Sequence, residues 1–174
     1  IIALAATGSA DNTAVLMLQE TIAALQVRVE ALEEKTKYLS VEEEKTIFRG
    51  TNVHVQNGMG ATNGVENDSD LYDDDATSVQ SNGLGNLIVG YDENIQDDSP
   101  SREKTGSHNL VIGPLHSYTS VGGLVAGFDN KLFAPYTSVS GGAGNETHVK
   151  SSSVSGGWRN KARGSHSSIS GGHF

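Results

Sequence analysis

The sequence predicts a mainly β protein with one long helix: an N-terminal coiled coil followed by a stack of parallel β-coils. Two patterns predict this architecture. A heptad repeat runs through the first forty residues, and a short motif recurs every 14 or 15 residues over the second half. The third observation is composition, since only 36% of residues are hydrophobic and 6% aromatic, with 21 glycines. So little apolar volume predicts a core that needs partner chains for its completion.

Residues 1–40 are expected to form a coiled-coil stalk, with a helix from about residue 12 to 39. Apolar residues at alternating spacings of three and four form an a/d seam through more than three heptads. The residues of this seam are Val15, Leu18, Ile22, Leu25, Val29, Leu32, Thr36 and Leu39. An amphipathic helix on a globular core is the alternative, but it does not require so strict a period.

Two features of the seam point to different numbers of chains. Ile22 and Val29 at a positions, with leucine at d, favour a dimer. The pattern Arg28-Val29-x-x-Leu32-Glu33 instead matches a motif of short trimeric coiled coils. Arg28 at g and Glu33 at e face each other between chains, where the guanidinium can pair with the carboxylate. The expected trimerisation residues are Ile22, Leu25, Arg28, Val29, Leu32 and Glu33.

Residues 41–85 are expected to form a β collar with an acidic loop. The segment 46–58 contains two short β-type runs, and Gly50-Thr51-Asn52 can turn between them. Asn57-Gly58 and Asn63-Gly64 are further turn signals. The following stretch, from about 65 to 82, is acidic and poor in apolar residues, which predicts an exposed loop.

Residues 86–174 form the repeat array, whose units are too small to bury a core alone. SVSGGAGN (138–145), SVSGGWRN (153–160) and SISGGHF (168–174) recur at a period of 15, and LVAGFDN, LVIGPLHS and NLIVGYDEN extend the pattern backwards. A spacer at about 92–106 interrupts it and is expected to be an exposed loop. Because the sequence ends inside a unit, further repeats are expected beyond Phe174.

Each unit is expected to place one apolar face inside the stack, because strand side chains alternate. The expected core residues are Leu110, Ile112, Leu124, Val139, Val154 and Ile169. Glycines that close the units (Gly127, Gly142 and Gly157) are expected to adopt turn conformations forbidden to larger residues. Asparagines three residues later (Asn130, Asn145 and Asn160) are expected to bind turn backbone and to stack as a ladder.

The repeats GSHNLVIG, GGLVAGFDN and SSVSGGWRNKARGSHSSISGG resemble the head repeats of trimeric autotransporter adhesins of the YadA type. The resemblance covers about 86–174 and implies a left-handed parallel β-roll shared by three chains, projecting from a coiled-coil stalk. This sequence has S-V-S-G-G where the family has S-V-A-I-G, and no membrane-anchor barrel is expected within these residues. A coil followed by a roll also suits the trimeric fibres of phages and injection systems.

Candidate sites for metals and catalysis are weak. Histidines from three chains could meet at an axis (His54, His116, His148 or His166), but no H-x-H or H-x₃-H spacing supports a metal site. Five aspartates between 68 and 75 offer oxygen ligands for calcium, without the glycine and glutamate of an EF-hand loop. No nucleophile is placed on a strained turn beside a base. We therefore expect no cofactor and no enzymatic activity.

The expected function is structural projection and adhesion in a homotrimeric extracellular fibre on a bacterial surface; the alternative is a receptor-binding tail-fibre segment of a virion or injection system. Tyr91, Phe128 and Trp158 follow closing glycines and are the candidate contacts with a host-surface protein or glycan. Packing against a neighbouring chain is the competing interpretation of these aromatics. The net charge of −9 argues against nucleic acid, and no apolar run is long enough to span a membrane.

Overall fold

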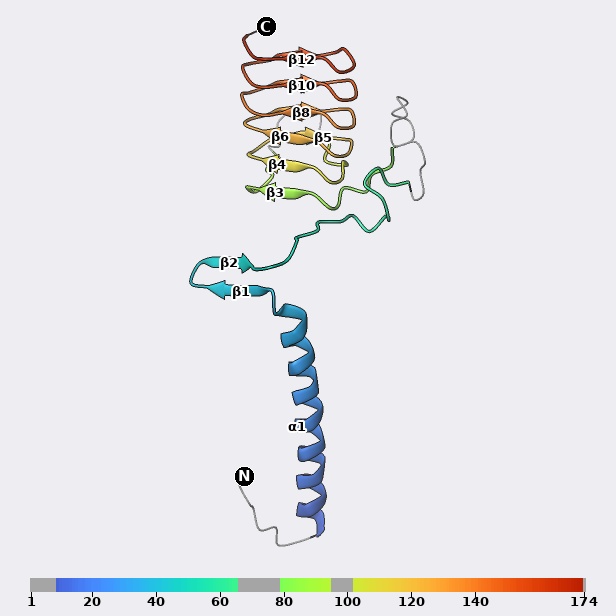
Figure 1. The fold of residues 1–174 in the computed structure, drawn as a ribbon, viewed down its shortest axis with the longest axis vertical. Coiled ribbons are helices and arrows are strands. Elements are labelled where there is room, and N and C mark those ends of the chain that lie inside the picture. The colour runs from blue at the N-terminus through green and yellow to red at the C-terminus, as the bar shows by residue number, and fades with distance from the viewer. Residues whose placement is uncertain (1–8, 66–78, 95–101, 174) are drawn as a thin grey trace. The chain divides into compact units, whose positions relative to one another are not determined.

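The structure, a computed structural model, describes residues 9–65, 79–94 and 102–173. The chain divides into two compact units, Ile1–Val53 and His54–Phe174 (Figure 1). The expected collar is thus divided, because residues from His54 onward group with the repeats. The five aspartates of the acidic loop, between 68 and 75, and the centre of the spacer (95–101) lie outside the described residues.

The first unit begins with α1 (Ser9–Thr36), a helix of 28 residues. Its heptad seam is uncovered within the chain: Ile22 is 47% exposed, Leu25 49%, Val29 51% and Leu32 58%. The predicted helix was three residues too long at its C-terminal end. Leu39, expected to be the last residue of the seam, instead begins a strand and pairs with Phe48.

A two-stranded antiparallel hairpin follows α1 and consists of β1 (Leu39–Glu42) and β2 (Lys45–Phe48). The turn falls at Glu43-Glu44, with Glu43 at a φ of 52°, not at Gly50-Thr51-Asn52 as predicted. The alternating run Val53-His54-Val55 forms no strand. An alternating pattern alone does not make a strand, because a strand also needs a hydrogen-bonded partner strand. The turn at Glu43-Glu44 gives β2 such a partner in β1.

The second unit is a parallel β-solenoid, which confirms the predicted stack of β-coils (Figure 1). One face is a six-stranded parallel sheet, here called the first sheet, in the order β12-β10-β8-β6-β4-β3. Its strands are β3 (Leu87–Val89), β4 (Leu110–Ile112), β6 (Leu124–Ala126), β8 (Ser138–Val139), β10 (Ser153–Val154) and β12 (Ser168–Ile169). The second sheet has the order β11-β9-β7-β5. Its strands are β5 (Ser117–Tyr118), β7 (Lys131–Leu132), β9 (Glu146–Thr147) and β11 (Lys161–Ala162).

One inward residue per strand of the first sheet, from β4 onward, fills the narrow interior. Register aligns Val139 with Val154 and Val125, and Val111 with Val125. These four valines are 0% exposed, and Ile169 packs against them. The second sheet contributes Tyr118, Leu132, Thr147 and Ala162 to the same interior.

The predicted core was wrong by one residue in the 14-residue units. Leu110 and Leu124 are half-buried and Ile112 is 38% exposed, because their side chains lie on the outer surface of the first sheet. The inward valine precedes the closing glycine by two residues in these units (Val111, Gly113) and by three in the 15-residue units (Val139, Gly142). The additional residue of a 15-residue unit therefore lies between the inward valine and the closing glycine. An alignment on the glycines is for this reason wrong by one residue at the strands of the shorter units.

Part of the predicted exposed spacer belongs to the solenoid. The amide of Tyr118 donates to the carbonyl of Glu103 at 2.8 Å, and the amide of Gly106 donates to the carbonyl of Tyr118 at 2.9 Å. Gly106 and Ser107 are buried. Residues 103–106 are therefore hydrogen-bonded to the turn that contains β5, and this described end of the spacer is not the freely exposed loop that the sequence predicted.

Candidate functional site

A ladder of buried asparagines lies at the edge of the solenoid turns. Asn130 and Asn145 are 0% exposed and Asn160 7%. The side-chain oxygen of Asn130 accepts the amide of Asn145 at 2.8 Å, and that of Asn145 accepts the amide of Asn160 at 2.9 Å. The side-chain nitrogen of each asparagine donates to two backbone carbonyls. One carbonyl belongs to the residue four positions earlier in the same unit (Ala126, Gly141 or Gly156), and the other belongs to the closing glycine of the next unit (Gly142, Gly157 or Gly172). The ladder therefore ties each turn to the next.

His116 occupies the rung below Asn130, a role that the sequence argument missed. Its Nδ1 accepts the amide of Asn130 at 3.1 Å, and its Nε2 lies 3.0 Å from the carbonyl of Ile112. These partners match those of an asparagine and require a neutral ring with the proton on Nε2. The signal was present in the sequence, since His116 follows Gly113 by three residues, as the asparagines follow their glycines.

Burial lowers the pKa of His116 below its ordinary value of 6.5, although its backbone hydrogen bonds and the charges of Asp92 and Asp129 oppose the shift. The folded state therefore binds this proton more weakly than the unfolded state does. The stability that this histidine contributes is complete above pH 6.5 and is lost as the pH falls from there toward the lower folded pKa.

We predict that acidification from pH 7.5 to 5.5 lowers the free energy of unfolding less in His116→Asn than in the natural protein. Asparagine can make both contacts of the neutral imidazole but does not titrate. Between the two pKa values the slope from this one group approaches about 1.4 kcal/mol per pH unit. Urea midpoints at fixed protein concentration measure the difference, and identical pH profiles would contradict the assigned role.

The closing glycines stack so closely that no side chain fits between them. A Cβ on Gly127 would lie 2.3 Å from the carbonyl oxygen of Gly142, and one on Gly142 or Gly157 would lie 2.1 Å from the next glycine's oxygen. All three have positive φ, at 108°, 74° and 87°. Their role is therefore both conformational freedom and close approach.

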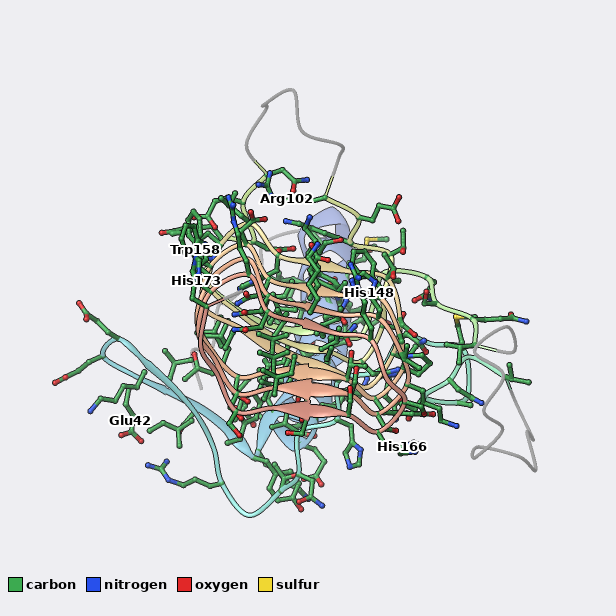
Figure 2. All side chains as sticks on the ribbon, turned by 90° about the horizontal axis from the view of Figure 1, so that it is seen from above. Glu42, Arg102, His148, Trp158, His166 and His173 are labelled. Atoms are coloured by element: carbon green, nitrogen blue, oxygen red, sulfur yellow. The ribbon has the colours of Figure 1, made fainter. Side chains whose placement is uncertain are left out.

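The predicted aromatic positions form only part of one column. Isolated parallel bridges link Phe128 to Ala143, Ala143 to Trp158 and Trp158 to His173. Phe128 is 52% and Trp158 47% exposed. Tyr91, at 92% exposure, lies outside this bridged column. The Trp158 ring contacts the His173 ring, with centroids 4.8 Å apart, so both project from the same edge (Figure 2).

Glu146 forms ionic contacts with three side chains on the second sheet. One carboxylate oxygen lies 3.0 Å from Lys161 Nζ and 2.9 Å from His148 Nε2, and the other lies 3.9 Å from Lys131 Nζ. Burial alone would raise the pKa of Glu146, but these neighbours outweigh it and lower the pKa. Sequence reasoning did not single out this cluster, although Lys131 and Lys161 each lie 15 residues from Glu146.

The flanks of the spacer are held by ionic contacts. Lys104 Nζ lies 2.9 Å from Asp92 Oδ1, and the Tyr118 hydroxyl donates to Asp92 Oδ2 at 2.8 Å. Burial and the Asp92 carboxylate raise the pKa of Tyr118. Arg102 Nε lies 3.1 Å from Asp129 Oδ1. These contacts fix the described ends of the spacer to the solenoid.

A hollow of about 390 Å³ lies against the first turns of the second unit. Its lining is Gln56, Asn57, Gly58, Gly60, Ala61, Thr62 and His108. His108 Nε2 accepts the amide of Asn57 at 3.3 Å, and Nδ1 lies 3.1 Å from the carbonyl of Thr62. This histidine therefore holds the loop onto the solenoid.

The histidines considered for a threefold metal site have separate surroundings. His116 is buried in the ladder, His148 contacts Glu146, and His166 Nδ1 lies 2.8 Å from Ser165 Oγ. Among residues 9–65, 79–94 and 102–173, no three His, Cys, Asp or Glu side chains gather as metal ligands would. Within the same residues, no helix combines the length and apolar character that a bilayer crossing requires.

Comparison with protein-family models, with curated proteins and with solved structures finds no significant match for this chain.

Proposed function

We propose that this chain is a structural and adhesive segment of a homotrimeric extracellular surface fibre, without catalytic activity. The observation that carries the proposal is the uncovered heptad seam of α1, whose a and d side chains from Leu18 to Leu32 are 47–60% exposed. A seam of this period buries its apolar residues only against other helices. Copies of the same chain supply those helices.

Arg28 and Glu33 support three chains in preference to two. Both lie on exposed positions flanking the seam, where the arginine of one helix can reach the glutamate of the next. The arginine stem would also cover the leucine and valine contacts between chains. In a trimer each helix would then share one Arg28–Glu33 pair with each of its two neighbours.

A second apolar surface supports self-association of the solenoid unit. The outer surface of β3, β4 and β6 carries Leu87, Val89, Leu110, Ile112, Leu124 and Ala126. Leu87 and Val89 are each 54% exposed. From β8 onward the corresponding outward positions are serines. An apolar patch bounded by polar positions is typical of a protein interface, and packing it against its own copies is consistent with a shared roll.

Cysteine cross-linking tests the parallel arrangement, since the natural chain has no cysteine. Leu32→Cys places a thiol at a d position near the end of α1, where parallel helices in register bring identical residues together. We expect mild oxidation to give a disulfide-linked pair of chains within an unchanged assembly. The matched control is Val27→Cys, at the outward f position and 65% exposed, which should remain unlinked. Equal cross-linking of both variants, or of neither, would contradict the proposal.

A further inference from the structure

Charge is distributed very unevenly along this chain. Residues 131–174 contain five lysines and arginines and a single acidic residue, Glu146, for a net charge of +4. Residues 1–130 contain seven basic and twenty acidic residues, for a net charge of −13. The later solenoid turns are therefore cationic within a strongly anionic protein. Such asymmetry indicates a surface for a negatively charged partner.

The solenoid gathers much of this charge on the outer surface of the second sheet. Register places Lys131, Glu146 and Lys161 side by side, and Leu132, Thr147 and Ala162 between the two outward rows are buried. We call the outward side chains of β7, β9 and β11, with the residue two positions later in each turn, the basic face. Its residues are Lys131, Phe133, Glu146, His148, Lys161 and Arg163.

Glu146 shows how this face holds an anion. Its carboxylate lies between two lysines that belong to the turns before and after it, with His148 as a third donor. The lysines are two turns apart, about 10 Å by strand spacing. They remain partly open to solvent, with side chains 35% and 37% exposed. One internal carboxylate therefore neutralises the row only in part.

Aromatic rings accompany the cations. The Phe133 and His148 rings lie 5.0 Å apart at one end of the face. At the other end, the Arg159 guanidinium lies 4.8 Å from the centroid of the Trp158 ring. Figure 2 places Trp158 and His148 toward opposite ends of the same side of the turn. Cations with flanking aromatic surfaces suit a ligand that is anionic and has apolar ring faces.

We propose that the basic face binds an acidic polysaccharide, with Lys131, Lys161 and Arg163 contacting its carboxylate or sulfate groups and the aromatic rings contacting sugar faces. This inference rests on the proposed adhesive function and names its ligand class. In such a polysaccharide the acidic groups are separated by sugar rings, and this wide spacing matches that of Lys131 and Lys161, which lie two turns apart. Nucleic acid fits less well, because residues 1–130 have a net charge of −13 and would repel its densely charged phosphate backbone. Three copies would add avidity to weak single contacts.

The test measures binding of a heparin oligosaccharide and of polygalacturonate to the full chain, with neutral dextran and a single-stranded DNA oligonucleotide for comparison. We expect sulfated and carboxylated sugars to bind, more weakly at higher salt, and dextran not to bind. Lys161→Gln with Arg163→Gln should weaken binding at least tenfold. Glu146→Gln should strengthen it severalfold, because the competing carboxylate is removed. Lys37→Gln with Lys45→Gln changes the net charge equally in the first unit and should leave the affinity unchanged.

Three outcomes would overturn the inference: no binding of either acidic sugar, equal losses in the two double variants, or DNA bound as tightly as the sugars. Molar mass is measured on every variant, so that a loss of assembly is recognised. A trimer that binds no acidic sugar would reject this inference and leave the fibre proposal standing. A monomer that binds acidic sugars through Lys161 and Arg163 would reject the trimeric fibre and leave the polysaccharide site standing.

Discussion

Replacing Asn145 by alanine is expected to lower the free energy of unfolding by about 2–5 kcal/mol per chain, because buried groups lose their partners. The amide of Asn160 loses its acceptor at 2.9 Å, and the carbonyl of Gly141 loses its donor at 3.2 Å. Water does not replace the contact with Asn160, because Asn145 is 0% and Asn160 7% exposed. Urea denaturation followed by circular dichroism at fixed protein concentration measures the loss.

Two variants separate the ladder from a general effect of substitution. Asn145→Asp keeps an acceptor for the amide of Asn160 but directs a carboxylate at the carbonyls of Gly141 and Gly157, so it should also destabilise. Ser140→Ala, at an exposed position of the same turn, should change stability by less than about 0.5 kcal/mol. A ladder without structural importance would make all three variants alike.

Gly142→Ala is expected to be similarly damaging, at about 2–5 kcal/mol, through strain and overlap together. The residue has a φ of 74°, and its Cβ would lie 2.1 Å from the oxygen and 2.7 Å from the nitrogen of Gly157. Neither atom can move without separating two turns of the solenoid. Thermal unfolding of the purified variant measures the effect.

The adjacent glycine provides the matched control. A Cβ on Gly141 meets only the oxygen of Ser155, at 3.8 Å, and its φ is not in the left-handed region. Gly141→Ala should therefore be neutral, or stabilise by up to about 1 kcal/mol through the unfolded chain. If Gly141→Ala and Gly142→Ala were equally harmful, the stacking explanation would fail.

The repeat period predicted the solenoid because it records which residues recur in equivalent places. It aligned Val139, Val154 and Ile169 correctly, since these units have equal length. It failed at Leu110 and Leu124, where three consecutive apolar residues leave the inward one undetermined. Only the strand register, with Val125 opposite Val139, resolves that choice.

The sites were harder to predict than the fold. The sequence argument grouped only residues of the same type. It therefore did not place His116 with the asparagines, although His116 follows its closing glycine by three residues, as they do. The charges around Glu146 come from three turns, and only a known register makes them neighbours. The hairpin turn was misplaced because Glu43-Glu44 has no turn-forming composition, whereas Gly50-Thr51-Asn52 does.

The central claim is that copies of this chain fold together as a trimer, and the molar mass in solution tests it most directly. Light scattering on the eluting protein at micromolar concentration should give three times the 18.3 kDa of one chain, with no smaller folded species. Dilution should lower the molar mass and the β-sheet signal together, because the trimer proposal makes folding depend on assembly. A stable species of single-chain mass with an intact β-sheet spectrum would contradict the account.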